Sequence, residues 1–392
     1  MSLRSSPPSS GTALWEIAGL FLKLGTTAFG GPAAHIAMME DEVVRRRRWL
    51  TREEFLDLVG ATNLIPGPNS TELAIHIGHR RAGWAGLLVA GVAFILPATI
   101  IVAGIAAAYV RWGKLPALEG LLYGVKPVII AIIVRALWTL GQTALKTRFL
   151  AVIATLAIPL NLMGVNELVV LFGAGALVAV LQTIRRPCGP TRPAANAAVP
   201  FFPLAAATGT ATAASALSFG LWPLFLFFLK VGAVLFGSGY VLLAFLRADL
   251  VERWQWLTEA QLLDAIAVGQ ITPGPVFTTA TFIGYLLAGI PGAGVATVGI
   301  FLPAFFFVAI SGPLIPRLRR SPVAGAFLDG LNVASLALMA VVTAQLARAA
   351  LVDPWTIALA VISGALVLWG RINFTWLILA GAAIGAAVVI GR

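Results

Sequence analysis

Pro66-Gly67-Pro68 interrupts an apolar segment over 55–78, and the same tripeptide, Pro273-Gly274-Pro275, interrupts a second apolar segment over 262–286. Proline removes a backbone N–H donor and breaks a helix, which leaves other N–H and C=O groups without intrahelical partners. Such groups are costly in hydrocarbon, so a break persists only where protein, water or a bound ion satisfies them. The two breaks are therefore candidates for a functional site.

The breaks belong to a repeat with a period near 207 residues. Phe21-Leu22-Lys23-Leu24-Gly25 recurs as Phe228-Leu229-Lys230-Val231-Gly232, and Trp49-Leu50-Thr51 recurs as Trp256-Leu257-Thr258. Apolar composition alone would not keep Trp, Lys and Pro in register. The sequence predicts an N-terminal tail over 1–13, a first repeat over 14–184, a Pro/Ala/Thr-rich linker over 185–218 and a second repeat over 219–392.

The composition predicts a membrane protein. Hydrophobic residues make up 59% of the chain and charged residues only 11%, whereas a soluble protein needs about 25% charged residues to cover its surface. The formal net charge of +11 comes largely from short arginine clusters between apolar runs, such as Arg45 to Arg48 and Arg80-Arg81. This is the positive-inside pattern of a multi-pass protein in a bilayer, not a nucleic-acid interface.

The fold class that we predict is all-α and polytopic. Each copy is expected to contain a first helix over about 14–34 or 221–244, and about five crossing helices in all. The broken segment either crosses the membrane once or enters and leaves on one side. If it is re-entrant, the arginines at 45–48, 80–81 and 317–320 fall on one face, and an odd number of crossings inverts the second copy. We therefore predict inverted repeats, each with a re-entrant hairpin.

The breaks are suited to binding an oxyanion. A half-helix that starts after Pro68 or Pro275 presents open N–H groups and the positive end of its dipole. Matched interruptions in inverted repeats are a good sequence indication of a transporter's binding site; two plain proline kinks are the alternative. The predicted binding residues around the breaks are Asn63, Pro66, Gly67, Pro68, Asn69, Ser70, Thr71, Gln270, Pro273, Gly274, Pro275, Thr278 and Thr279.

Three lysines lie inside apolar segments. Lys23 and Lys230 are repeat equivalents, and a lysine at the bilayer centre costs roughly 2.5–3.5 kcal/mol unless it has a partner or a wet cavity. As a pair they would neutralise a dianion, which makes them substrate-binding candidates; the alternative is that they snorkel to the headgroups. Lys126, directly before Pro127, is a further intramembrane cation for which a structural role is favoured.

Other polar residues are less informative. Glu72 and His76 follow the first break by one and two turns, and a buried carboxylate or imidazole there could carry a coupling proton. A charge near the end of a re-entrant helix is the plainer interpretation. Thr51 and Thr258 are expected to be helix N-caps. The sequence shows no catalytic group, metal-ligand cluster, cofactor motif or ATPase motif, so we expect a non-enzymatic protein driven by ion gradients or membrane potential.

Several longer motifs resemble those of the chromate ion transporter family. They are Phe29-Gly30-Gly31-Pro32-Ala33-Ala34-His35, Arg48-Trp49-Leu50-Thr51 and Ile65-Pro66-Gly67-Pro68-Asn69-Ser70-Thr71-Glu72 in the first copy, and Gln270-Ile271-Thr272-Pro273-Gly274-Pro275 in the second. The resemblance covers about 14–390 and marks the long-chain, two-domain type. Ser238-Gly239 stands where the first copy has Gly31-Pro32, so the halves are expected to contribute unequally.

The resemblance implies a secondary transporter that exports chromate from the bacterial cytoplasm and so gives chromate resistance. It implies an inner-membrane location, a membrane potential or proton gradient as driving force, and sulfate as a competing anion. A passive oxyanion channel or a sulfate-type oxyanion transporter is the alternative, and an enzyme acting on lipid phosphates is a third. Gly381-x-x-x-Gly385 makes a homodimer a further candidate.

Overall fold

The structure is a computed structural model that describes residues 10–29, 31–112, 116–185, 219–236, 241–369 and 374–390. Every regular element within these ranges is helical. Apart from Arg185, the predicted linker over 185–218 lies outside the described residues, as does the segment 237–240 that contains Ser238-Gly239.

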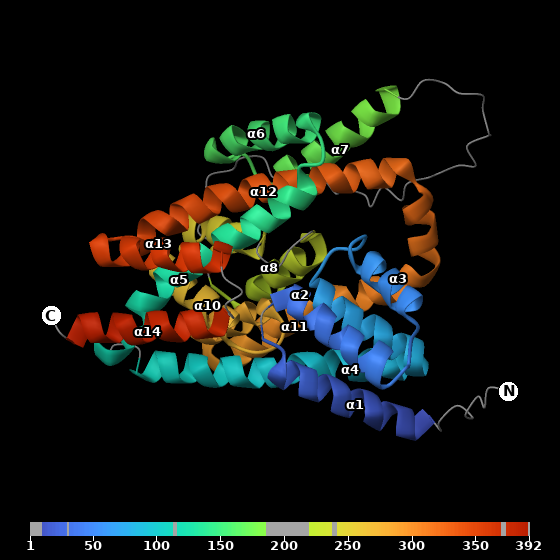
Figure 1. The fold of residues 1–392 in the computed structure, drawn as a ribbon, viewed down its shortest axis with the longest axis horizontal. Helices are drawn as coiled ribbons and strands as arrows, with labels where there is room; N and C mark the ends of the chain where they lie inside the picture. The colour runs from blue at the N-terminus through green and yellow to red at the C-terminus, as the bar shows by residue number, and fades with distance from the viewer. Residues whose placement is uncertain are drawn as a thin grey trace.

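The helices repeat in order along the chain (Figure 1). The first copy contains α1 (Ser10–Thr27), α2 (Gly31–Glu40), η1 (Asp41–Arg46), α3 (Arg52–Thr62), α4 (Asn69–Trp112), α5 (Pro116–Ala144), α6 (Arg148–Leu162) and α7 (Glu167–Arg185). The second contains α8 (Leu221–Val234), α9 (Leu242–Phe245), η3 (Leu246–Arg253), α10 (Glu259–Ile271), η4 (Val276–Thr278), α11 (Thr279–Arg320), α12 (Pro322–Ala350), α13 (Pro354–Trp369) and α14 (Phe374–Ile390). Among the described residues, segments of α4, α5, α7, α11 and α12 are long and apolar enough to cross a membrane. The predicted all-helical, two-repeat membrane protein is confirmed.

The first break is the tip of a re-entrant hairpin. α3 is capped by Thr51, whose hydroxyl accepts the Glu54 N–H while the Glu54 side chain accepts the Thr51 N–H; Thr258 and Gln261 repeat this capping box at α10. The 11 residues of α3 span about 16 Å, half of a bilayer core. After the break the chain returns, because Arg80 Nη2 donates to Glu54 Oε1 at 3.3 Å. The re-entrant hairpin and both N-caps are confirmed.

α4 and α11 each reverse direction at a glycine. Gly83 has φ +60° and Gly289 has φ +62°, a left-handed conformation that glycine adopts without a Cβ clash. The two parts of α4 then pack so closely that a Cβ on Gly78 would lie 2.2 Å from the carbonyl oxygen of Gly86. Gly284 and Gly292 make the same contact in α11. The first part of each helix is therefore an arm of the re-entrant hairpin, and only the second part runs across the fold.

The single first helix predicted over 14–34 is wrong. α1 ends at Thr27, and the chain turns back into α2 at Gly31, which has φ +77°. Arg81 contacts both ends of this α1–α2 hairpin, which therefore lie close together. Its Nη2 lies 3.0 Å from Glu16 Oε2 in α1, and its guanidinium lies 5.0 Å from the ring centroid of Trp49, after η1. α1 thus forms one arm of a hairpin with α2 and does not supply a crossing of its own.

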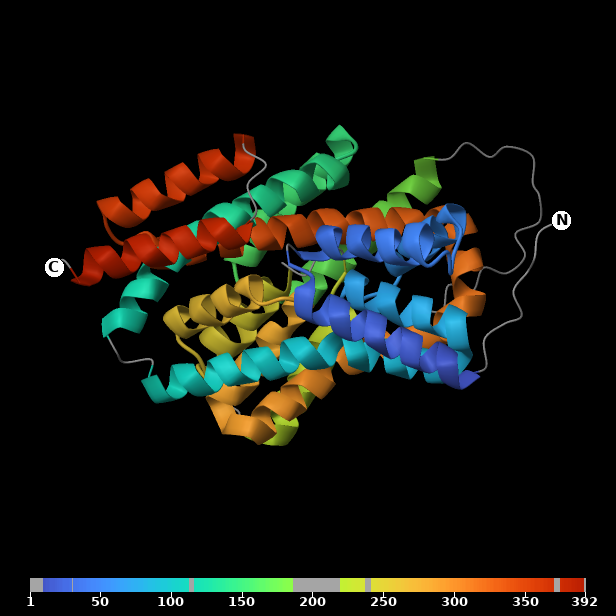
Figure 2. The same cartoon turned by 60° about the horizontal axis from the view of Figure 1, so that its bottom comes forward.

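The second copy is inverted relative to the first, as predicted. Figure 2 shows the long part of α4 running away from the N-terminal side of the molecule, whereas the long part of α11 runs towards it. α5 and α12 are also antiparallel, because Lys146, just after α5, pairs with Asp329 near the start of α12, with Nζ and Oδ1 2.7 Å apart. The helices α7 and α11 both end towards the N-terminal side (Figure 1).

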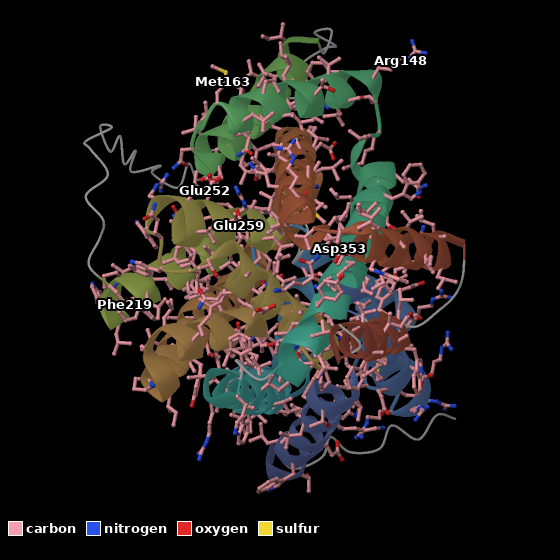
Figure 3. The ribbon with its side chains drawn as sticks, turned by 90° about the vertical axis from the view of Figure 1, so that its left-hand side faces the viewer. Arg148, Met163, Phe219, Glu252, Glu259 and Asp353 are labelled. Carbon is pink, nitrogen blue, oxygen red and sulfur yellow. The ribbon has the colours of Figure 1, made fainter. Side chains whose placement is uncertain are left out.

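Two ends of the molecule can now be named. The arginine end is defined by Arg47, Arg80 and Arg81. The opposite end, which faces the viewer in Figure 3, is the Glu252 end; there Arg247 pairs with both Glu252 and Glu259.

Opposite labelling of the two ends is expected. With Cys188 replaced by serine, a cysteine placed at Arg46 should react with a membrane-impermeant maleimide from one side of the membrane only. A cysteine placed at Glu252 should react from the other side only. Labelling of sealed right-side-out and inside-out vesicles measures this, and reaction of both positions from one side would contradict the inversion.

The C-terminal glycine motif has a partner within the chain. Gly381 and Gly385 of α14 lie against Gly120 and Gly124 of α5, and a Cβ on Gly124 would lie 1.9 Å from the carbonyl oxygen of Gly381. The motif therefore packs two helices of one chain together, and a homodimer stays a prediction.

Candidate functional site

Each Pro-Gly-Pro break contacts the other copy at the interface between the two repeats. Gly67 N–H donates to the carbonyl of Leu235, at the end of α8, at 2.8 Å; Gly274 N–H donates to the carbonyl of Ala28, at the end of α1, at 2.9 Å. Ala28 and Leu235 are repeat equivalents, so one hydrogen bond is made twice about a pseudo-two-fold relation. Each break satisfies an N–H by capping the first helix of the other copy.

Close packing makes glycine necessary at the centre of the breaks. Gly67 has φ +134° and Gly274 has φ +88°, values that side chains rarely tolerate. A Cβ on Gly274 would lie 2.7 Å from the Cβ of Ala98, and a Cβ on Gly67 would lie 3.8 Å from the Cβ of Ala304. Ala98 and Ala304 are again repeat equivalents, each directly after a proline of the long helix.

The half-helices that follow the breaks begin as predicted but unequally. In the first copy α4 begins at Asn69, and the N–H groups of Thr71 and Glu72 both bond to the Pro68 carbonyl, at 2.8 and 3.0 Å. In the second copy the 3₁₀ turn η4 comes first, with Thr278 N–H bonding to the Pro275 carbonyl at 3.0 Å. Both N-termini point their dipoles from the breaks, but only the first starts as a regular α-helix.

The predicted hydroxyl and amide groups divide into two sets. Asn69 Nδ2 donates to Asn63 Oδ1 at 2.8 Å, which joins the two arms of the first hairpin on an exposed side. Thr278 and Thr279 are buried, and their hydroxyls donate to the backbone carbonyls of Pro275 and Val276 at 2.8 Å. The other predicted residues lie on the same segments: Pro66, Gly67, Pro68, Ser70, Thr71, Pro273, Gly274 and Pro275 are buried and Gln270 is half-buried.

Each predicted lysine has an acidic partner that sequence reasoning missed. Lys23 Nζ lies 2.7 Å from Glu42 Oε1, and Lys230 Nζ lies 2.5 Å from Asp249 Oδ2. The acid side chains are 10% and 1% exposed, and the hydrogen bond from Lys23 holds the pKa of Glu42 below its ordinary value. The signal was available, because both acids follow their lysine by 19 residues.

Each lysine lies close in sequence to the residue on which the break of the other copy docks. Each one comes five residues before the carbonyl, at Ala28 or Leu235, that accepts the N–H of the opposite break. In each copy the ion pair thus connects the first helix, α1 or α8, with the π-helical segment, η1 or η3, that follows it. Substrate binding by Lys23 and Lys230 stays a prediction.

Lys126 takes part in a cluster around the buried carboxylate of Asp264. Its Nζ lies 3.0 Å from Asp264 Oδ1, and the Tyr109 hydroxyl donates to Asp264 Oδ2 at 2.9 Å. Asp264 belongs to α10, the first arm of the second hairpin, whereas Tyr109 and Lys126 belong to α4 and α5. The repeat equivalent of Asp264 is Asp57, which is exposed.

Loss of Asp264 should therefore destabilise the protein. Removing one partner of a buried ion pair costs about 3–5 kcal/mol, because the other charge is left unpaired. Asp264→Ala is expected to lower the thermal midpoint of the detergent-solubilised protein, measured by fluorescence-detected size exclusion. The matched change Asp57→Ala should leave that midpoint near the wild-type value, and equal effects of the two changes would contradict the structural role.

Glu72 has no visible partner for its charge. The residue is fully buried, and neither carboxylate oxygen has a hydrogen-bond partner among the described residues. It lies against the first break, since a Cβ on Gly67 would be 2.4 Å from Glu72 Oε1. His76, one turn further along α4, is also buried, and its Nε2 has no hydrogen-bond partner among the described residues.

Comparison with known proteins places these features in a family. The sequence pattern of the family described as chromate transporter matches residues 15–180 and again 222–386. The chain belongs to the chromate transporter family. Both halves of this chromate transporter family member match the pattern, and each match includes one Pro-Gly-Pro break.

Individual relatives cover nearly the whole chain. The chromate transport protein of Cupriavidus metallidurans is 34% identical over 95% of this chain and 92% of its own length. The chromate transport protein of Pseudomonas aeruginosa is 33% identical over 84% of this chain and 80% of its own length. No solved structure matches.

Within the described residues, no group of three His, Cys, Asp or Glu side chains is placed to hold a metal ion.

Proposed function

We propose that this member of the chromate transporter family exports chromate across the bacterial inner membrane, with the arginine end in the cytoplasm. The observation that carries the proposal is the reciprocal docking of the two breaks. It brings two helix N-termini, from oppositely oriented hairpins, to the interface between the inverted copies, where alternating access in such folds takes place. Relatives named as chromate transport proteins support the choice of anion.

The chemistry of the site fits a tetrahedral dianion. Open N–H groups at the start of α4 and η4 would donate to the oxyanion, and the helix dipoles would stabilise its charge. Asn63 and Asn69 supply further donors, and Lys23 and Lys230 supply cations once the anion competes with their carboxylate partners. Sulfate has the same shape and charge, so we expect it to compete.

The membrane potential favours export. Moving a dianion outwards across a potential that is negative inside yields about 4.6 kcal/mol per 100 mV, twice the value for one elementary charge. Uptake against the same potential would need several co-transported cations. Export therefore requires no ATPase domain, and we propose a secondary transporter, not an enzyme.

Chromate uptake by inside-out vesicles tests the proposal. Vesicles that contain the protein should accumulate chromate when a potential positive inside is imposed, and sulfate should reduce the rate. Control vesicles carry the Gly67→Ala, Gly274→Ala double variant. Absence of potential-dependent uptake would refute chromate export, and uptake that neither saturates nor shows counterflow exchange would favour a passive channel.

A further inference from the structure

The first arm of α4 carries an unusual row of titratable groups. Glu72, His76 and His79 follow one another at i, i+4 and i+7, a spacing that places them on one face of a helix. The row starts at the first break, against Gly67, and ends beside Arg80 at the arginine end. His79 is half-buried, and its ring centroid lies 5.4 Å from that of Trp84, after the reversal at Gly83.

Charged side chains on the neighbouring elements point to other partners. Lys23 bonds to Glu42, Arg80 to Glu54 and Arg81 to Glu16, while His35 Nε2 bonds to the Ala28 carbonyl. Across the interface, α11 presents the methyl group of Ala304 to the break beside Glu72. A bare carboxylate in such surroundings would be strongly disfavoured, because burial of an unpaired charge costs several kcal/mol. A proton on Glu72 removes that charge.

The second copy shows what this position needs for packing alone. Thr279 and Ile283 occupy the places of Glu72 and His76, and the Thr279 hydroxyl is satisfied by the Val276 carbonyl at 2.8 Å. Glu72, by contrast, leaves two oxygens unsatisfied in a buried place, and His76 leaves a ring nitrogen unsatisfied. Packing at the tip of a hairpin therefore does not explain why the first copy has a buried acid and a buried histidine where the second copy has Thr279 and Ile283.

We propose that Glu72 is the proton-binding site of the transporter and that His76 and His79 connect it to water at the arginine end. This inference rests on the proposed export of chromate and adds its coupling ion. A proton from hydronium passes to His79, then to His76, and then to a Glu72 oxygen, which becomes a neutral carboxylic acid. Both imidazoles are neutral again after each transfer. Glu72 exchanges its proton with water of the arginine end through His76 and His79 in one state of the cycle, and with water of the Glu252 end in the other. A full cycle therefore moves one proton across the membrane, which couples chromate transport to the pH gradient.

Separation of net transport from exchange tests the inference. In proteoliposomes, the wild type should transport chromate when only a pH gradient is imposed, and should also exchange labelled chromate for unlabelled chromate. Glu72→Gln, permanently neutral, should lose the transport driven by the pH gradient and keep the exchange. His76→Ala should slow the gradient-driven transport and keep the exchange. Glu53→Gln, the same change at an exposed site of α3, should match the wild type in both assays.

The outcomes separate two failures. Transport driven by the pH gradient at the wild-type rate in Glu72→Gln would overturn the proton site while leaving chromate transport intact. Absence of both activities in the wild type would refute the proposed function itself. If Glu72→Gln does not accumulate in the membrane, the wild-type protein provides a second test. Dicyclohexylcarbodiimide modifies protonated carboxyl groups in apolar surroundings, so it should label Glu72, as detected by mass spectrometry. Failure to label Glu72 would overturn the proposal.

Discussion

Replacing Gly274 by alanine is expected to abolish chromate transport. The new Cβ would lie 2.7 Å from the Cβ of Ala98 and 3.1 Å from the carbonyl oxygen of Gly25, so the second break could not stay docked on the first copy. The left-handed φ of +88° adds strain of about 1–3 kcal/mol for a residue with a side chain. Gly67→Ala should be less damaging, because its Cβ meets the movable Glu72 side chain at 2.4 Å instead of backbone.

Two further variants make this prediction specific. Ala98→Gly removes the atom that the new methyl group would strike, so the double variant Gly274→Ala, Ala98→Gly should recover part of the transport. Gly104→Ala places a methyl group on α4 where nothing lies within 4 Å, and it should transport at the wild-type rate. The measurement is potential-driven chromate uptake divided by the amount of protein in the membrane. Wild-type uptake by Gly274→Ala would show that docking of the breaks is dispensable.

Lys230→Ala is the second change with a large expected effect, and it should reduce chromate uptake to background. The variant alone is ambiguous, since it leaves Asp249, which is 1% exposed, with Arg253 as its remaining cationic partner in place of two, and so weakens the pairing of a buried charge. Lys230→Ala with Asp249→Ala removes both charges. If the lysine binds the anion, the double variant should fold like the wild type and remain inactive.

A surface pair provides the control for this test. Lys146 and Asp329 form a comparable ion pair, but the lysine side chain is 59% exposed, and exposed pairs contribute only about 0.2–1 kcal/mol. Lys146→Ala with Asp329→Ala should therefore transport at the wild-type rate. Recovery of transport in the Lys230, Asp249 double variant would show that the lysine only neutralises its buried partner, and the same pair of changes at Lys23 and Glu42 repeats the test in the first copy.

The sequence predicts the repeat, the hairpins and the inversion because each leaves a strong local signal. Pro-Gly-Pro is incompatible with a continuous helix, Thr51 and Thr258 are typical N-caps, and the arginine clusters mark one face. The turn after α1 was missed because Gly30-Gly31-Pro32 sits within an apolar run that reads as one helix. The reversals at Gly83 and Gly289 follow shortly after the ends predicted for the broken segments, at 78 and 286.

The site was less predictable because its contacts join distant parts of the chain. Docking of Gly67 on Leu235 depends on the packing of two copies, which no local pattern encodes. The acidic partners of the lysines, Glu42 and Asp249, lie on π-helical segments that no sequence motif predicts. Pairing of Asp264 with Lys126 crosses from one copy to the other, so the repeat itself gave no indication of it.

A crystal grown with chromate would locate the anion through the anomalous scattering of chromium. We expect one strong chromium peak between the two breaks, within hydrogen-bonding reach of the backbone N–H groups that follow Pro68 and Pro275. A peak confined to the arginine end, beside Arg80 and Arg81, with none at the breaks, would contradict a binding site built from the two docked hairpins.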